Sequence, residues 1–384
     1  MSFLPSSPFR WLSIYYSSYF FAFGVYLPFW SVWLAWLGLP ANDIGIVLGA
    51  GVLARFVVNL LVTPRFHLPE QLLPAIRWLS ALAAVVGFTH LLATPDLLWL
   101  TALSVAINMA LGPAIPISDA LANHYTRRRL VDYGRARLWG SLAFVVGSTL
   151  TGGLVERFGE GVIVPVAAGA LAIAFGWSLT SPNPLPANEE RQGRTRKPLL
   201  SVLRLPGVGV FISLVALIQG SHAAYYAFSA IHWTQSGISD VVVGYLWSLG
   251  VVVEVAMFAI SQKLFGGWRV ASLFRLAAVA VMVRWTITGL TTDVWALVFS
   301  QSLHGITFGV AHIAAMRYIQ QQEADNMMAL QALYSAIPMG IVMAALTMLS
   351  GELYHLFGGH SFFIMALLGV PALVLTSRRF CNLG

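Results

Sequence analysis

Apolar residues occur along this chain in long runs that short polar segments separate. Each run is long enough to cross a hydrocarbon layer of about 30 Å as a helix that rises about 1.5 Å per residue. The twelve runs cover residues 10–36, 43–64, 73–93, 97–122, 135–155, 161–180, 206–233, 240–262, 269–290, 294–316, 327–350 and 356–377. The pattern predicts an all-α membrane protein with twelve transmembrane helices.

One long polar stretch, residues 181–198, divides the twelve runs into six and six. Its content of Pro, Asn and charged residues is typical of a loop. We therefore predict three parts: an N-terminal six-helix bundle over residues 1–180, a cytoplasmic central loop over 181–205, and a C-terminal six-helix bundle over 206–384.

The two halves resemble each other at a shift of 199 residues. At this shift Gly45 falls on Gly244, and Arg55 falls on Glu254. Parallel repeats related by an axis along the membrane normal are a known plan of transporters, in which two bundles rock around one site. We expect two pseudo-symmetric bundles and transport by alternating access.

Basic residues gather in alternate loops. Those on one side are Arg10, Arg65, Arg77, Arg127, Arg128, Arg129, Arg191, Arg194, Arg196, Lys197, Arg204, Lys263, Arg269, Arg317, Arg378 and Arg379. The opposite loops carry mainly acidic residues, with Arg157 the lone basic one. Because Lys and Arg favour cytoplasmic loops, we expect a multi-pass protein whose two termini both lie in the cytoplasm.

Composition excludes several other classes of protein. Hydrophobic residues make up 58% of the 384 and charged residues 10%, whereas soluble domains are roughly 25% charged. The net charge of +7 resides mostly in the loops, so we expect a lipid bilayer and no nucleic acid as partner. The single cysteine, Cys381, excludes an internal disulfide. The sequence contains no phosphate loop, metal-spaced cluster, nucleophile elbow or dinucleotide fingerprint. We therefore expect that the protein is not an enzyme and that it binds no cofactor and no metal.

Ionisable residues inside the apolar runs are candidates for function, because charge at membrane depth is costly unless it is paired or faces a water-filled path. Arg55 lies about a dozen residues into its run, near mid-membrane. Its repeat mate Glu254 has a similar depth and the opposite sign. Arg55 could form a salt bridge within its bundle, pair with Glu254, or hold a substrate carboxylate while Glu254 takes up and releases a proton.

Arg284 and His304 form a second candidate group, in the ninth and tenth runs. A histidine in an apolar run is often a hydrogen-bonded core residue, but beside an intramembrane arginine its imidazole could exchange protons near neutral pH. The other histidines in apolar runs are expected to be structural or to line a cavity; these are His222, His232 and His312.

Asp119 and Arg137 flank a basic triplet and form a third candidate pair. Arg137 lies only about one turn into its predicted helix, nearer the cytoplasm than the midplane. Asp119 and Arg137 could meet a substrate only if their helices project beyond the bilayer or if a cavity reaches inward. We predict that they form a gate or a site pair.

Aromatic residues make up 12% of the chain and crowd the first run of each half. Most such rings pack the bundle or anchor it at the interface, but some could line a cavity and stack on a flat ligand. The candidate substrate contacts are Tyr19, Tyr26, Trp30 and Tyr226. Aromatic walls and a central arginine would suit an aryl carboxylate.

The chain resembles the lactose permease branch of the major facilitator superfamily over nearly its whole length. The resemblance rests on YFFAFGVYLPFW from Tyr19, the segment around Asp119, YGRARLWG from Tyr133 and LHGITFGVAHIAAMRYI from Leu303. It implies the fold of that superfamily, two six-helix bundles, and symport with protons.

The same resemblance implies roles for particular residues. It places the sugar-binding carboxylate on Asp119 and its partner on Arg137, and the arginine and histidine of the C-terminal half on Arg284 and His304. The proton-carrying glutamate of lactose permease falls on Thr307, which cannot titrate. A second glutamate of the sugar site falls on Val251, one turn before Glu254, and the usual cytoplasmic loop signature is replaced by TPRFHLPEQ from Thr63.

Arg55, YGRARLWG and the GVVVEVAMF stretch around Glu254 resemble the phenylpropionate permease group within that superfamily. This implies proton-coupled uptake of 3-phenylpropionate or a related aryl acid across a bacterial inner membrane. We predict a monomeric transporter in which Arg55 attracts the carboxylate, Glu254 carries the proton, and His304 and Arg284 tune it. The alternatives are a sugar or nucleoside proton symporter that uses Asp119 and Arg137, and a membrane sensor that transports nothing.

Overall fold

The computed structural model describes residues 6–66, 68–187 and 199–378. These residues are almost entirely helical and contain no named strand; a single isolated bridge joins Ser6 and Pro182. The predicted all-α class is confirmed. Several basic residues assigned to the cytoplasmic loops lie outside the described residues, as does the lone cysteine: Arg191, Arg194, Arg196, Lys197, Arg379 and Cys381.

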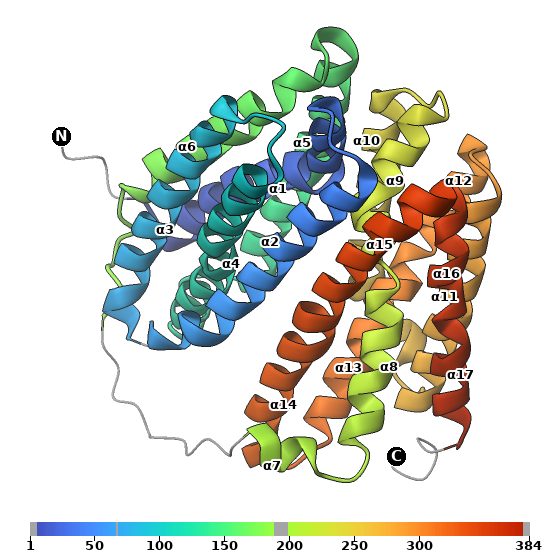
Figure 1. Ribbon diagram of the computed structural model, residues 1–384. Helices are drawn as coiled ribbons and strands as arrows, with labels where there is room; N and C mark the ends of the chain where they lie inside the picture. The colour runs from blue at the N-terminus through green and yellow to red at the C-terminus, as the bar shows by residue number, and fades with distance from the viewer. Residues whose placement is uncertain (1–5, 67, 188–198, 379–384) are drawn as a thin grey trace. The chain divides into compact units, whose positions relative to one another are not determined.

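The helices of the N-terminal half follow the predicted runs (Figure 1). They are α1 (Pro8–Trp36), α2 (Ala41–Leu61), η1 (Thr63–Arg65), α3 (Pro69–Thr89), η2 (His90–Leu92), α4 (Leu97–Arg127), α5 (Tyr133–Phe158), η3 (Glu160–Val162) and α6 (Ile163–Ser178).

The C-terminal half is divided into more pieces. After the short α7 (Leu199–Leu203), its helices are α8 (Val208–Gly220), α9 (Ala223–Gln235), α10 (Asp240–Phe265), α11 (Val270–Leu290), α12 (Val294–Ser302), η4 (Gly305–Val310), α13 (Ala311–Gln320), α14 (Ala324–Ala336), η5 (Ile337–Val342), α15 (Met343–Phe357), η6 (Gly358–His360), α16 (Ser361–Leu367) and α17 (Gly369–Arg378).

Eleven helical segments of the described chain are long and apolar enough to cross a membrane. The last of them, Asp325–Thr376, has 52 residues, and the 3-10 turn η6 interrupts it. About 20 residues suffice for one crossing, so this segment has the length of two of the twelve predicted spans.

Four predicted spans contain irregularities that the sequence pattern did not indicate. The twelfth is interrupted at Leu368, between α16 and α17. The seventh is broken at Ser221 and His222, between α8 and α9. The tenth and eleventh contain the π-helical segments η4 and η5. Hydropathy reports how apolar a run is and not which carbonyl each amide bonds, so it cannot reveal a changed hydrogen-bond register.

The described chain forms two compact units. Among the described residues, unit 1 comprises 6–39, 50–66, 68–187 and 239–245, and unit 2 comprises 40–49, 199–238 and 246–378. The first turns of α2 and α10 therefore belong to a different unit from the rest of those helices. In unit 2, Gly45 approaches the backbone of Gly351, and in unit 1 Gly244 approaches the backbone of Ser148.

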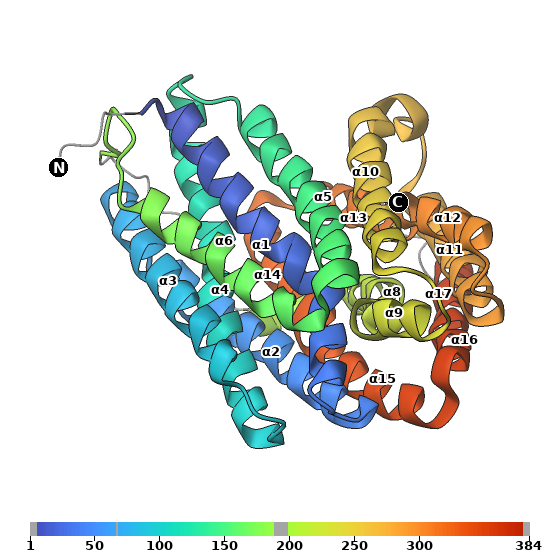
Figure 2. The same cartoon turned by 90° about the horizontal axis from the view of Figure 1, so that it is seen from above.

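Within unit 1, α1 packs lengthwise against α5 and α6 (Figure 2). Two glycines bring the backbones of α1 and α5 close together. A Cβ on Gly24 would meet the carbonyl oxygen of Phe144, and a Cβ on Gly147 would lie 2.5 Å from the carbonyl oxygen of Phe21. Small residues at helix crossings allow this approach in membrane proteins, where packing rather than the hydrophobic effect drives association.

The repeat is visible in how each half ends its last helix. Arg77 on α3 donates from Nε to the carbonyl oxygen of Ser178 at the end of α6, at 2.9 Å. Arg275 on α11 donates from Nη2 to the carbonyl oxygen of Thr376 in α17, at 3.1 Å. A cation at a helix C-terminus satisfies carbonyls that have no partner within the helix. The same device occurs at equivalent places in both halves.

We predict that Gly147→Ala lowers the free energy of unfolding by about 1–3 kcal/mol, since the clash is with backbone and only separation of α1 and α5 relieves it. Unfolding in detergent, followed by tryptophan fluorescence, measures the change. Gly169→Ala on α6 is the control: nothing lies within 4 Å of its added Cβ, so the better helix propensity of Ala should leave stability equal or slightly higher. Equal stability of the two variants would contradict the close approach.

Candidate functional site

A ladder of aromatic rings runs along α1 in unit 1. Neighbouring rings lie 4.9–6.5 Å apart between centroids, which is the range of favourable ring contacts. We call this set the aromatic ladder: Tyr16, Tyr19, Phe20, Phe23, Tyr26 and Trp30. Apart from the adjacent pair Tyr19 and Phe20, its members are three or four residues apart, so they share one side of the helix.

Arg55 of α2 lies against the aromatic ladder. Its guanidinium carbon is 5.3 Å from the centroid of Phe23, and its Nε donates to Oδ1 of Asn108 on α4 at 3.1 Å. Asn108 in turn donates from Nδ2 to the hydroxyl of Tyr26 at 3.0 Å and to its own helix at Ser104. No described residue accepts a hydrogen bond from the two terminal amino groups of Arg55, so both can bind an anion.

Glycines make room for this arrangement. A Cβ on Gly51 of α2 would lie 2.5 Å from Nδ2 of Asn108, and one on Gly112 of α4 would lie 3.0 Å from Cγ of Arg55. The missing side chains let α2 and α4 approach until arginine and asparagine meet. The site is thus built by a local backbone approach as well as by its polar groups.

Asp119 and Arg137 lie near each other but do not form a direct ion pair in the described part of the chain. Asp119 accepts a hydrogen bond from the hydroxyl of Tyr16 at 2.7 Å. The guanidinium carbon of Arg137 lies 3.9 Å from the centroid of Phe20 and 5.6 Å from that of Tyr16. Tyr16 of the aromatic ladder thus contacts both members of the predicted pair, and Tyr133 of α5 also interacts with both.

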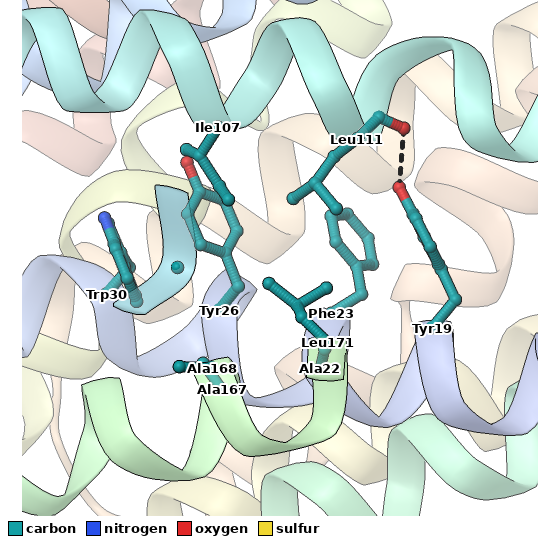
Figure 3. Close-up of a pocket in the computed structure, with 11 residues that line it drawn as sticks. Tyr19, Ala22, Phe23, Tyr26, Trp30, Ile107, Leu111, Ala167, Ala168 and Leu171 are labelled. Carbon is teal, nitrogen blue, oxygen red and sulfur yellow. Dashed lines mark hydrogen bonds between the residues drawn. The ribbon is translucent and has the colours of Figure 1, made fainter. Parts of the chain in front are cut away.

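A small cavity lies behind the aromatic ladder, inside unit 1 (Figure 3). Tyr19, Phe23, Tyr26 and Trp30 point into it, and the hydroxyl of Tyr19 donates to the carbonyl oxygen of Leu111 at 2.8 Å. Its volume of about 10 Å³ has room for one water molecule at most. It is a gap in the packing and is too small for an aryl acid.

Unit 2 contains a buried cation, Arg284, with which no carboxylate of the described residues is in contact. Arg284 of α11 is 0% exposed. It donates from Nη1 to Nδ1 of His304 at 2.8 Å and to Oγ1 of Thr307 at 2.9 Å, and from Nη2 to Oε1 of Gln301 at 2.7 Å. Its guanidinium carbon also lies 4.2 Å from the centroid of Trp285. Neutral acceptors and a ring face compensate the buried charge.

The contact with Arg284 fixes the tautomer of His304. A guanidinium can only donate, so Nδ1 of His304 must accept and the proton of the neutral ring sits on Nε2. That nitrogen is 3.5 Å from Oε2 of Glu254 on α10, whose side chain is 24% exposed while that of His304 is 8% exposed. His304 thus stands between the carboxylate and the buried cation.

The irregular helices position this network. Gly305 in η4 faces α10 so closely that a Cβ would lie 2.8 Å from Val253, which brings His304 to Glu254. At the break between α8 and α9, His222 directs Nδ1 to the carbonyl oxygens of Ile218 and Gln219, both at 3.2 Å. Its Nε2 then lies 3.0 Å from Oγ1 of Thr307. His222, predicted to be structural or cavity-lining, is connected to Arg284 through Thr307.

The predicted site residues thus fall into two groups, one in each unit. Unit 1 holds Arg55, Asp119, Arg137, Tyr19, Tyr26 and Trp30, and unit 2 holds Glu254, His304, Arg284 and Tyr226. Tyr226 stacks on His222 at 5.8 Å between centroids. No group of three metal-binding side chains occurs among the described residues.

Sequence reasoning missed Asn108 and Gln301 as partners of the arginines. Both are neutral amides inside apolar runs, and this is the signal that could have found them. Gln301 is 1% exposed and donates from Nε2 to the hydroxyl of Tyr225 at 2.8 Å. A buried amide needs acceptors and donors on both sides, so it marks a polar network as surely as a charge does.

The family model described as "MFS_1 like family" matches residues 9–365. The chain belongs to this family. It is 42% identical over 369 residues to the "Probable 3-phenylpropionic acid transporter" of Escherichia coli (strain K12), covering 96% of this chain and 97% of that protein. It is 25% identical over 385 residues to the "Maltose permease" of Geobacillus stearothermophilus, covering 95% and 94%.

Solved structures give the same fold. The nucleoside transporter NupG matches with a TM-score of 0.79 at 13% identity, over 97% of this chain and 99% of that one. The POT family transporter PepTSo matches with a TM-score of 0.76 at 9% identity, over 98% of both chains. The predicted superfamily and fold class are confirmed. The protein is a multi-pass membrane transporter of a small molecule and not an enzyme.

We predict that Thr307→Val lowers the free energy of unfolding by about 1–3 kcal/mol, because the isosteric valine leaves one buried N–H of Nη1 of Arg284 without an acceptor and removes the hydroxyl that contacts Nε2 of His222. Unfolding in detergent with tryptophan fluorescence measures this. Thr347→Val is the matched control, since the buried Thr347 hydroxyl bonds only the carbonyl of Met343 in its own helix and its loss should cost little. If both variants are equally stable, Arg284 does not depend on Thr307.

Proposed function

We propose that this transporter imports an aromatic monocarboxylate of the 3-phenylpropionate kind together with protons by alternating access. The contact set of Arg55 carries the proposal: a cation held from one side by Asn108 and backed by the ring of Phe23, with two terminal amino groups left for an anion. The 42% identity to a probable 3-phenylpropionic acid transporter supports this substrate class.

In this proposal the carboxylate of the substrate binds the terminal amino groups of Arg55. An arginine fork matches a carboxylate with two parallel hydrogen bonds, and such bonds between charged groups are the strong ones. Asn108 fixes the orientation of the fork through Nε. The binding energy is not spent on breaking an existing salt bridge, because a neutral amide is the described partner of this arginine.

The phenyl ring of the substrate would lie against rings of the aromatic ladder. Tyr26 is tied to Asn108 by a hydrogen bond, and Trp30 lies 4.9 Å from Tyr26 between centroids. One anchored carboxylate and adjacent ring faces select for an aryl acid of short chain. Tyr19 bonds α4 through its hydroxyl and is assigned to hold the ladder in place.

Glu254 is proposed as the proton carrier of unit 2. It is the carboxylate closest to the Arg284 network, and its partner His304 has its Nδ1 occupied by Arg284. If His304 were protonated on Nδ1, that N–H would face the N–H of Arg284, and two donors repel each other. The exchangeable proton is therefore assigned to Glu254. His304 and Arg284 tune it by holding the imidazole in one orientation.

Asp119 and Arg137 are proposed to act as a gate pair. Their contacts with Tyr16 and Phe20 allow the two charges to meet in one state and part in another. We further propose a bacterial inner membrane, a monomer, and cytoplasmic termini, on the distribution of basic loops.

A sugar or nucleoside remains the competing substrate class, and maltose is in the name of one relative. Uptake of labelled 3-phenylpropionate in proteoliposomes, challenged with unlabelled aryl acids, sugars and nucleosides, decides between them. Competition by sugars and none by aryl acids would overturn the proposal. No observation favours the non-transporting sensor.

We predict that Arg55→Lys weakens binding of 3-phenylpropionate about tenfold, since lysine cannot form the paired hydrogen bonds, a loss of about 1.4 kcal/mol. Calorimetry on purified protein measures Kd. Binding of 3-phenylpropan-1-ol, which lacks the carboxylate, should change little. Arg157→Lys, an exposed arginine that also lies over a ring, is the control. An unaltered Kd in Arg55→Lys would remove Arg55 from the site.

We predict that Glu254→Gln abolishes accumulation of substrate driven by a proton gradient but retains exchange of preloaded substrate, because exchange needs no net proton movement. Proteoliposome uptake and counterflow separate the two activities. Glu352→Gln, an exposed carboxylate of the same unit, should behave like wild type. Full accumulation by Glu254→Gln would exclude Glu254 as carrier.

A further inference from the structure

A second histidine lies two turns beyond His304 on the same side of the tenth span. The rings of His304, Phe308 and His312 form a parallel stack, with centroids 5.4 Å and 6.4 Å apart and planes 17° and 5° apart. We call this the imidazole stack. Its first ring contacts Glu254, and Nδ1 of its last ring is 2.8 Å from the hydroxyl of Tyr334 on α14.

The flanking helix repeats the same layers. On α10, Glu254 faces His304, and one turn later the ring of Phe258 meets His312 edge-on at 5.9 Å between centroids. Unit 2 therefore has a polar layer at Glu254, an aromatic layer at Phe258 and Phe308, and a second polar layer at His312. The carboxylate of Glu254 also interacts electrostatically with His312.

His312 can accept a proton where His304 cannot. Nδ1 of His304 faces a permanent donor, Arg284, whereas Nδ1 of His312 faces a hydroxyl that can either donate or accept. When His312 is protonated, its Nδ1–H donates to the oxygen of Tyr334, whose own proton turns away. The charged or titratable groups nearby are Glu254 on α10, Tyr334 on α14, His304 on the same span, and Arg284 on α11 behind it.

We propose that His312, supported by Tyr334, is the station that receives the proton from Glu254 and releases it to the cytoplasm. This rests on the proposed function, proton-coupled import with cytoplasmic termini; in that orientation the tenth span runs toward the cytoplasm from Val294 to Gln320. The O–H bond of protonated Glu254 breaks, leaving the carboxylate, and His312 becomes an imidazolium that gives the proton to cytoplasmic water. The aromatic layer must open for the transfer, which keeps the proton from leaking.

The test uses full-length protein in proteoliposomes with a trapped pH indicator and labelled 3-phenylpropionate. His312→Gln keeps a side chain that can hydrogen-bond Tyr334 but cannot carry the proton. We expect net uptake and proton release into the lumen to slow at least tenfold, while counterflow stays within about twofold of wild type. Imidazole in the lumen should restore proton release in His312→Ala, because a diffusible base replaces the missing one, and should not restore it in Glu254→Gln.

Controls separate the failure modes. His232→Gln, a partly buried histidine elsewhere in unit 2, should resemble wild type, and Tyr334→Phe should slow release less than His312→Gln. Unchanged proton release in His312→Gln overturns the inference, as does equal loss of counterflow and net uptake in a variant with a normal Tm. If wild type itself couples no proton to 3-phenylpropionate, the proposed function fails instead.

Discussion

The cost of placing a cation where water is scarce governs the polar chemistry of this protein. The three arginines of the candidate site each have the guanidinium over an aromatic ring: Arg55 over Phe23, Arg137 over Phe20 and Arg284 over Trp285. Neutral groups accept the hydrogen bonds of Arg55 and Arg284: two amides, a hydroxyl and an imidazole. This compensation is weaker than a buried ion pair, and breaking a buried pair is costly. A transporter of the proposed carboxylate must bind and release an anion repeatedly, so weak compensation of its cations suits this role.

The two halves retain a common scaffold but differ in chemistry at equivalent positions. Arg77 and Arg275 end the last helix of each half in the same manner. Arg55 and Glu254, which correspond in the repeat, have opposite charge. Arg55 contacts the amide of Asn108 and the ring of Phe23, whereas Glu254 contacts His304. The helix-ending contact of an arginine thus recurs in both halves. The polar interior of each half has specialised, one half toward a cation and the other toward a titratable carboxylate.

Most of the fold could be predicted from the sequence because a hydrocarbon layer requires long apolar helices, and the observed helices follow the predicted runs. The break at His222 and the π-helical segments could not be predicted. They change which backbone carbonyl each amide bonds but leave the hydropathy of the run unchanged. The charged residues of the candidate site could be named for the same reason that the spans could: charge inside an apolar run is rare. Their geometry could not. Asp119 and Arg137 were predicted to form a gate or a site pair, but the sequence did not reveal that the hydroxyl of Tyr16 bonds Asp119 or that the ring of Phe20 lies against Arg137.

Thr307 shows how one position changes the surroundings of a buried cation. In the lactose-permease-like pattern a glutamate stands here, and in this fold its carboxylate would lie where Oγ1 of Thr307 accepts from Arg284 at 2.9 Å. A carboxylate at that distance would be held ionised by the cation. With threonine in this place, the titratable group sits on α10 instead, and His304 separates it from Arg284. The imidazole of His304 has a fixed orientation and separates Glu254 from the cation, so in the proposed mechanism Glu254 can exchange a proton without displacing the buried charge.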